Sequence, residues 1–226
     1  MNRRYRDRAA FFPNHGTLVV ADIHFGRAAT SNVEAPLGER GDVTERLAAL
    51  CDRFDPDEVV IAGDLLHAFS TVPDGVTESV RALQETVREA GARPVVTPGN
   101  HDGLLDEVWD GPVETEYQLG DWVVCHGHEL PETDAAGYVV GHDHPTIEVE
   151  GRRHPCFLTA KDAYRGADLL MLPAFTRLAP GVAVNRMRAS EFGSPLVTDA
   201  DRLRPVVDDG DDALEFPPLG EFRRLL

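Results

Sequence analysis

The chain has 226 residues, of which 42% are hydrophobic and 27% are charged. This balance is typical of a folded globular protein and excludes a disordered or fibrous chain. Asp and Glu number 39 against 22 Lys and Arg, giving a net charge of −17 that argues against binding nucleic acid or a membrane through net charge. Lys161 is the single lysine. We expect so acidic a protein in a halophilic cytoplasm, where salt screens the self-repulsion.

The cysteines and the N-terminal region indicate no disulfide framework and no targeting segment. Cys51, Cys125 and Cys156 show no Cys-x-x-Cys spacing, so neither a disulfide framework nor a cysteine zinc site is expected. Arginines occur at positions 3, 4, 6 and 8, but the apolar stretch Ala9–Phe12 behind them is too short for a signal peptide. No apolar run approaches the ~20 residues of a membrane span. We therefore expect a cytoplasmic protein with no membrane partner.

Two amphipathic segments alternate with short valine-rich runs in the first part of the chain. In Asp42–Phe54 and in Val76–Ala90, large apolar residues recur at intervals of three and four, which predicts two helices. The runs bounded by Gly, Pro or Asp predict buried strands at Thr17–Ala21, Glu58–Ala62, Pro94–Thr97, Trp122–Cys125 and Gly137–Val140. The alternation of strand and helix predicts an α/β fold that begins with a parallel sheet.

The second half of the chain reads as mostly β-structure. Glu114–Cys125 predicts a hairpin that turns at Gly120 and Asp121. Further strands are expected at Thr146–Glu150, Pro155–Thr159, Leu169–Leu172 and Gly181–Asn185. We expect one domain over residues 1–200. The acidic segment 201–226 would pack on it or be partly loose.

Polar residues that bind metals follow each of the five predicted strands. The segments after these strands are Asp22-Ile23-His24, Gly63-Asp64, Gly99-Asn100-His101-Asp102, His126-Gly127-His128 and Gly141-His142-Asp143-His144. With His67, they contain seven of the nine histidines. Each segment alone is also typical of a turn. Because the carboxyl ends of strands meet at one edge of an α/β sheet, together they predict a site for manganese, iron or zinc.

These motifs resemble those of the calcineurin-like metallophosphoesterases, which are D-x-H, G-D, G-N-H-D, H-G-H and G-H-x-H. Ala21–Gly26 (ADIHFG) and Gly63–His67 (GDLLH) are most similar to the SbcD nuclease branch. The length is similar to that of its small stand-alone relatives. The resemblance covers residues 9–185. It implies a four-layer αββα sandwich with mixed sheets, whose second sheet the periodicity does not show.

The resemblance also implies two divalent metal ions, manganese foremost, with iron, zinc or nickel as alternatives. The implied ligands are Asp22, His24 and His144 for the first ion, Asn100, His126 and His142 for the second, and Asp64 as a bridge. The spacing of His142 and His144 supports this independently, because residues two apart on an extended segment point to the same side. In two-metal chemistry, a hydroxide between the ions attacks the phosphorus in line.

Three further residues are expected to take part in catalysis. His101 would stabilise the transition state or protonate the leaving oxygen, and Asp102 would orient its ring. By the resemblance, His67 would help to position the phosphate near His101. His128 is expected to donate a hydrogen bond to a backbone group or carboxylate beside the ligands without binding a metal ion itself.

The substrate stays open at this point, and three functions remain. The first is a nuclease or other phosphodiesterase, although the chain lacks the long C-terminal extension of SbcD-type nucleases and no basic stripe replaces it. The second is a phosphoesterase for nucleotides or other small molecules, which the acidic composition suits. The third is a non-catalytic metal-binding scaffold, which the complete set of expected ligands disfavours.

Overall fold

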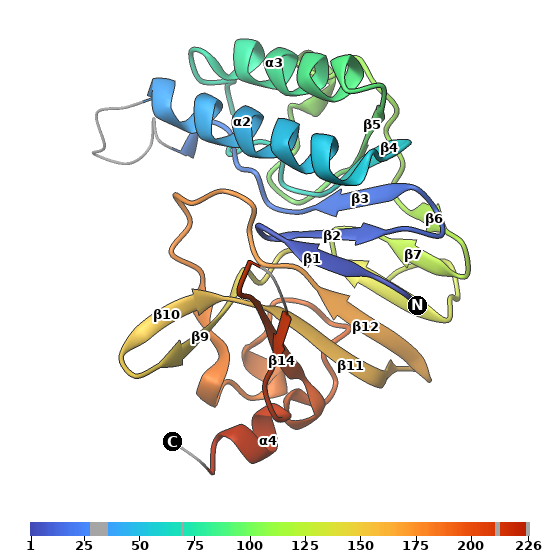
Figure 1. Cartoon of the computed structure of the whole chain (residues 1–226), viewed down its shortest axis with the longest axis vertical. Helices are drawn as coiled ribbons and strands as arrows, with labels where there is room; N and C mark the ends of the chain where they lie inside the picture. Colours follow the sequence, from blue (N-terminus) through green and yellow to red (C-terminus); the bar gives the residue numbers. More distant parts are fainter. Residues whose placement is uncertain (28–35, 69, 211–212, 225–226) are drawn as a thin grey trace.

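The computed structural model of the chain describes residues 1–27, 36–68, 70–210 and 213–224. Two β-sheets pack against each other, and helices α2 (Pro36–Phe54) and α3 (Val76–Glu89) lie beyond the first sheet at the top of Figure 1. The first sheet contains β1 (Arg4–Arg6), β2 (Ala9–Phe12), β3 (Thr17–Val20), β4 (Glu58–Ala62) and β5 (Arg93–Thr97), in that order. The last three of these strands run parallel, and β1 and β2 extend the sheet as an antiparallel hairpin.

The second sheet is also mixed and has the strand order β15-β14-β11-β12-β8-β7-β6. Its strands are β6 (Tyr117–Leu119), β7 (Trp122–Val124), β8 (Gly137–Val140), β11 (Phe157–Tyr164), β12 (Ala167–Met171), β14 (Arg204–Asp208) and β15 (Ala213–Glu215). Strands β7, β8 and β12 are parallel, and the other pairings are antiparallel. The segment after residue 200 therefore supplies two strands to this sheet.

A layer of short elements covers the outer face of the second sheet. It contains a small sheet of β10 (Arg152–Pro155), β9 (Pro145–Val149) and β13 (Val182–Ala183), the helical turns η2 (Val184–Arg186), η3 (Ala189–Glu191) and η4 (Ala200–Arg202), and the helix α4 (Leu219–Phe222). The predicted α/β fold class with mixed sheets is confirmed. The fourth layer differs from the first in that single turns, rather than long helices, build most of it.

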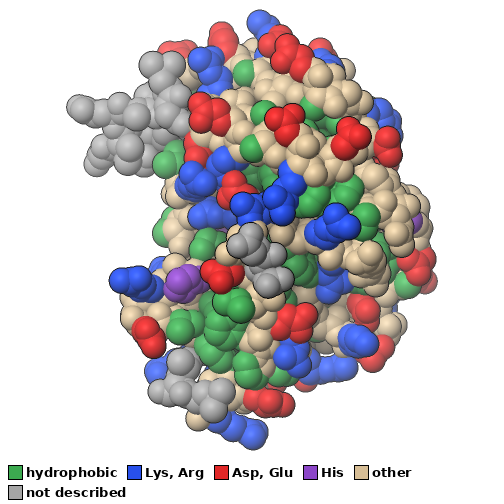
Figure 2. Space-filling view, in the orientation of Figure 1, with side chains coloured by type: hydrophobic (Ala, Val, Ile, Leu, Met, Phe, Trp, Pro, Cys, Tyr) green, Lys and Arg blue, Asp and Glu red, His purple; other side chains and the backbone are tan. Residues whose placement is uncertain are grey.

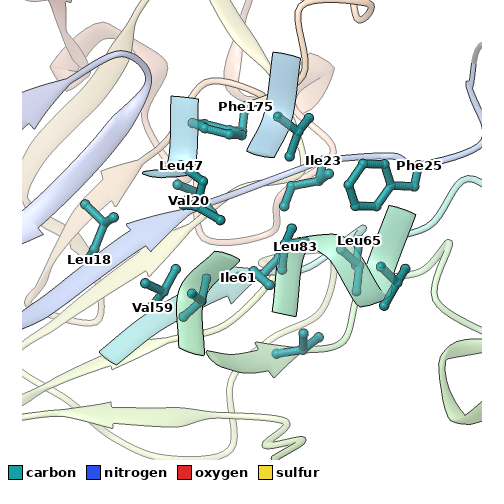
Figure 3. Packing of buried hydrophobic residues seen from close by; sticks show 14 of the residues in the cluster. Leu18, Val20, Ile23, Phe25, Leu47, Val59, Ile61, Leu65, Leu83 and Phe175 are labelled. Atoms are coloured by element: carbon teal, nitrogen blue, oxygen red, sulfur yellow. The ribbon is translucent and has the colours of Figure 1, made fainter. Parts of the chain in front are cut away.

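Side chains that alternate along the central strands build the core on both faces of each sheet. Leu18 and Val20 of β3 face the helical layer, whereas Val19 faces the second sheet. Figure 3 shows Leu47 of α2 and Leu83 of α3 in the first of these clusters, beside the strand residues. Because both faces of β3, β4 and β5 are buried beyond their first residues, the interiors of these strands are apolar, as is typical of parallel sheets.

Most predicted elements are confirmed, with shifts at their ends. Helix α3, strands β4 and β8 and the β6–β7 hairpin lie where the sequence predicts them. Helix α2 begins six residues before the predicted start at Asp42, because the apolar stripe that marks a helix begins only at Val43. Proline is favoured in the first turn of a helix, which fits the observed start at Pro36. In the described part of the chain, no helix is both long enough and apolar enough to cross a bilayer.

Candidate active site

Loops from both sheets meet at one edge of the sandwich, at the carboxyl ends of β3, β4, β5, β7 and β8. Backbone hydrogen bonds connect neighbouring loops: the His24 N–H donates to the Asp64 carbonyl at 2.8 Å, and the Gly141 N–H to the His126 carbonyl at 3.0 Å. The two sheets are joined here as well, because the His142 N–H lies 3.0 Å from Oδ2 of Asp22. The sequence prediction that these strand ends share one edge is therefore correct.

The backbone at this edge is strained. Positive φ angles between 47° and 72° occur at Asp22, His24, Asp64, His142 and His144. Each non-glycine residue in this region costs on the order of 1 kcal/mol, and such residues persist where the surrounding structure holds them and cluster at functional sites. The expected metal ligands thus lie on backbone turns that direct their side chains towards one another.

The first cluster of donor atoms contains Asp22, His24 and His144, whose ligand atoms lie within 4.8 Å of one another. The Nε2 atoms of His24 and His144 are 3.1 Å apart, and Nε2 of His144 is 3.4 Å from Oδ1 of Asp22. Asp22 and His24 are buried. Burial lowers the pKa of His24 to about 4, so its ring is neutral and has a lone pair for a cation.

The second cluster contains Asp64, His126 and His142, again with ligand atoms within 4.8 Å of one another. Nε2 of His126 lies 3.2 Å from Nδ1 of His142 and 3.1 Å from Oδ1 of Asn100. Asn100 follows β5, so the first sheet supplies two members of this group and the second sheet the others. The structure therefore brings together all seven residues expected as ligands.

Asp64 lies between the two clusters. Its Oδ2 atom is 3.4 Å from Nε2 of His126 in the second cluster and 3.8 Å from Nε2 of His24 in the first. Its other oxygen, Oδ1, accepts the backbone N–H of His101 at 2.9 Å. A carboxylate in this position can bind two cations at once, which fits the bridging role implied by the resemblance.

The electrostatics of the site favour positive charge. Burial by itself would lower the pKa of His126, but the hydrogen bond to Asp64 and the charge of Asp22 outweigh it and raise this pKa to about 9. Burial would also raise the pKa of Asp64, yet His126 and the His101 N–H hold it well below its usual range. Buried imidazoles and carboxylates that converge in this way fit hard or borderline divalent cations.

Two glycines give the ligands room. A Cβ atom on Gly63, which has φ of 77°, would lie 2.1 Å from Nδ1 of His126. A Cβ atom on Gly141 would lie 2.6 Å from Oδ2 of Asp22 and 2.7 Å from Cβ of Ala21. The glycines in the G-D and G-H-x-H motifs are therefore required by the close approach of ligands from the opposite sheet.

His67 and His101 lie together beside the first cluster. Their rings stack with centroids 5.0 Å apart, and both make edge contacts with the ring of His24 at 5.3 Å. Nε2 of His101 is 4.0 Å from Oδ2 of Asp64. The structure therefore places these two histidines side by side, and their roles near the phosphate stay predictions.

Asp102 is buried behind this pair and holds the loops that carry the site. Its carboxylate accepts the backbone N–H groups of Gly99 and Leu66, both at 2.8 Å, and of Leu65 at 3.3 Å. Desolvation by burial raises its pKa. These bonds tie the loop after β5 to the loop after β4, so Asp102 fixes His101 through the backbone. An effect on the orientation of the His101 ring stays a prediction.

A cavity of about 200 Å³ beside His144 adds residues that the sequence analysis does not single out as site residues. Arg8, Arg153 and Arg177 line it. Arg8 belongs to the two-residue turn between β1 and β2, so its place depends on a hairpin that the sequence analysis does not predict. The only signal is the pair Asp7-Arg8 directly before the apolar run Ala9–Phe12.

Comparisons with known proteins agree with this arrangement. The family model of the calcineurin-like phosphoesterases matches residues 16–170, which is more than half of the chain. Among solved structures, the nuclease MPE of Pseudomonas putida superposes with a TM-score of 0.62 and 25% identity over 89% of this chain and 88% of that one. Yfce, a phosphoesterase from E. coli, gives a TM-score of 0.45 and 18% identity over 89% and 98%. A sequence comparison with curated proteins finds no match.

The fold and the paired donor clusters define a metal-dependent hydrolase. The chain belongs to the calcineurin-like phosphoesterase family. Hydrolysis of phosphate esters and a requirement for divalent metal ions follow from this membership. The closer likeness to the SbcD branch stays a prediction.

Proposed function

We propose that the protein hydrolyses phosphodiester bonds in a nuclease-like reaction that depends on two divalent ions, preferably manganese. The observation that carries this proposal is the position of Asp64, whose Oδ2 atom lies within 4 Å of histidine nitrogens from both clusters. The similarity to the nuclease MPE supports the choice of a diester. Substrates would be DNA, nucleotides or related esters.

In this proposal the seven clustered residues divide into two ligand sets that share one carboxylate. Asp22, His24 and His144 would hold the first ion, Asn100, His126 and His142 would hold the second, and Asp64 would serve both. When bound, such a pair of ions lowers the pKa of water and neutralises charge on the phosphate oxygens. The strained turns keep the ligands in place before the substrate arrives, which limits reorganisation during the reaction.

His101 is the proposed catalytic residue that touches the substrate. Water adds to phosphorus and gives up one proton to the solvent, the bond from phosphorus to the leaving oxygen breaks, and His101 donates a proton to that oxygen or stabilises its charge. His67 stacks on the His101 ring and helps to position the phosphate. Asp102 is a positioning residue, because its hydrogen bonds reach the loops and not the substrate.

The alternative within the same family is a phosphoesterase for small molecules or nucleotides. The net charge of −17 favours it, since a long polyanion is repelled at low salt. A non-catalytic scaffold is the least supported function, because His101 and all seven clustered residues are present.

One set of assays separates these functions. Purified protein with manganese is incubated with bis-p-nitrophenyl phosphate, p-nitrophenyl phosphate, cyclic nucleotides and single-stranded DNA in high-salt buffer. We expect turnover of the diesters to exceed that of the monoester. Cleavage of the monoester alone would contradict the nuclease-like proposal, and bound metal without any turnover would favour a scaffold.

A further inference from the structure

The two sides of the metal centre carry opposite charge. On the side of His144, the cavity of about 200 Å³ is lined by three arginines and by no carboxylate among the described residues. On the side of His128, a second cavity of about 430 Å³ is lined by Glu116, Glu129 and Glu132. A substrate with more than one phosphate would therefore be attracted to one side and repelled from the other.

Arg8 is the arginine with charge available for a ligand. Its Nη1 atom donates to the carbonyl oxygens of Ala174, at 3.1 Å, and Thr176, at 2.5 Å, and this fixes the guanidinium at the cavity. No described carboxylate pairs with it. By contrast, Arg177 pairs with Asp42 at 2.7 Å, and Nε of Arg153 lies 3.8 Å from a carboxylate oxygen of Glu148. An arginine anchored to backbone carbonyls is still fully charged and has further N–H groups for an anion.

The charges that surround Arg8 leave a local positive excess. Arg46 and Arg177 lie close to it, and two carboxylates, Asp7 and Asp42, pair with them. Arg6 and Asp208 lie at the same turn, where Oδ2 of Asp208 accepts the Asp7 N–H at 2.6 Å, and they add one charge of each sign. Burial and the charge of Arg46 lower the pKa of Arg8 to about 10. An anion in the cavity would relieve this repulsion. Figure 2 shows that Lys and Arg side chains gather in a band across the middle of one face of this acidic molecule.

The backbone at Arg8 is not one that arginine prefers. Asp7 and Arg8 form the two-residue turn between β1 and β2, with φ of 43° and 67°. Glycine is the common residue at the second position of such a turn, because other residues are strained there. Arginine in this place therefore costs backbone energy, as it does at Arg165 in the turn between β11 and β12, so the case for Arg8 rests on its contacts and on the cavity.

A free polar group also lies at the cavity. Thr146 is 4% exposed and lines the same cavity, and its Oγ1 atom is buried without a hydrogen-bond partner among the described residues. Buried hydroxyl groups normally make a hydrogen bond, so the Thr146 hydroxyl indicates a partner that a ligand would supply.

On the basis of the proposed function, we propose that this cavity binds a second phosphate group of the substrate, with Arg8 as its main contact. The cavity will be called the arginine pocket; it is lined by Arg8, His144, Thr146, Arg153 and Arg177. Since His144 belongs to the first metal cluster, the second phosphate lies next to the one that is hydrolysed. The substrate is then a nucleic-acid strand or a nucleotide with a second phosphate group.

The test compares esters that differ only in this phosphate. The p-nitrophenyl esters of thymidine 5′-phosphate and thymidine 3′-phosphate are each assayed with and without a phosphate on the other hydroxyl. In whichever of the two series, 5′ or 3′, is hydrolysed faster, wild-type protein should favour the ester with two phosphates. The variant Arg8→Gly, which keeps the turn free of strain, should reduce that preference in kcat/KM about tenfold, as expected for the loss of a charge-assisted hydrogen bond.

Arg165→Gly is the matched control. Arg165 also has a positive φ, 49°, in the turn between β11 and β12. This turn precedes β12 and lies at the edge of the sheet opposite to the site. This variant should keep the preference of the wild type. Arg153→Gln changes an exposed side chain of strand β10 and should lower the preference in the same direction as Arg8→Gly. It provides a second measurement if Arg8→Gly does not fold. An equal loss for both kinds of ester, or no change in preference, would overturn the proposal.

A binding measurement separates failure of the pocket from failure of catalysis. Calorimetric titration of the manganese-loaded protein with thymidine 3′,5′-bisphosphate should show weaker binding to Arg8→Gly than to wild type, even if no diester is hydrolysed. The same titration with a short single-stranded oligodeoxynucleotide distinguishes a nucleotide from a nucleic-acid strand as the source of the second phosphate. The ligand whose affinity falls more in Arg8→Gly is the one that uses the pocket. Unchanged binding of both ligands would contradict the arginine pocket.

Discussion

The Nε2 atoms of His24 and His144 lie 3.1 Å apart, although the two residues are 120 positions apart in the chain and follow strands of different sheets. His24 follows β3, and His144 follows β8. A neutral His24 ring has one nitrogen that accepts and one that donates. The rings of His24 and His144 beside the carboxylate of Asp22 form a set of donors that suits a divalent cation, so the contact is consistent with one half of a metal centre.

The first prediction concerns the bridge. Replacing Asp64 by Ala removes the oxygen that lies near both clusters, so Asp64→Ala should lower bound manganese from about two ions per chain to about one or fewer and abolish turnover. Metal content is measured by elemental analysis after gel filtration. Asp74→Ala, at an exposed position before α3, is the control and should retain the metal. Full metal content in Asp64→Ala would contradict the bridging role.

The second prediction separates catalysis from metal binding. His101→Ala should reduce turnover of bis-p-nitrophenyl phosphate by roughly 10²- to 10⁴-fold, the usual contribution of a general acid, while the metal content stays near that of the wild type. His15→Ala, at an exposed histidine outside the motifs, should leave both unchanged. If His101→Ala released the metals, His101 would be a ligand and its proposed role would be wrong.

The third prediction concerns pH. The pKa of His126 is raised to about 9 in the metal-free chain, so this ring holds a proton at pH 7 that a metal ion must displace. Because protonation competes with binding below this pKa, manganese affinity should fall as the pH falls from 8.5 to 6.5, by up to about tenfold per unit. Calorimetry in two buffers of different ionisation enthalpy should show release of about one proton at pH 7. Affinity that does not vary over this range would contradict the raised pKa.

The fourth prediction concerns the space around Asp22. A methyl group at residue 141 would contact Oδ2 of Asp22 and Cβ of Ala21, so Gly141→Ala should weaken manganese binding by about tenfold or more. Gly41→Ala, in helix α2, is the matched control because a Cβ atom there has no neighbour within 4 Å. The control should raise the free energy of unfolding by about 0.5–1 kcal/mol and leave the metal affinity unchanged. Equal affinities in the two variants would show that Gly141 is not needed for ligand spacing.

The convergence of the expected ligands at one edge could be predicted from the sequence, for physical reasons. Asp22, Asp64 and His142 each follow a run of valine-rich residues, and the carboxyl ends of such strands meet at one edge. Asp22, Asp64 and His142 therefore have to lie near one another, and errors in the predicted ends of the helices do not change this.

The arginine pocket and the edge strands could not be predicted in this way. Strand β1 (Arg4–Arg6) is too short and too polar to show a period, and β14 (Arg204–Asp208) precedes an acidic run that resembles a surface segment. Strand β1 is placed by its hairpin with β2, and β14 is placed by pairing with β11, which is distant in the sequence. Arg8 reaches the site only because the β1–β2 hairpin packs beside the loop that contains Ala174.

The most direct test of the two-ion centre is a crystal structure of the manganese-soaked protein with anomalous scattering data collected near the manganese absorption edge. The account predicts two anomalous peaks about 3.5–4 Å apart on either side of Asp64, one beside His24 and His144 and the other beside His126 and His142. A single peak, or peaks elsewhere in the molecule, would contradict it.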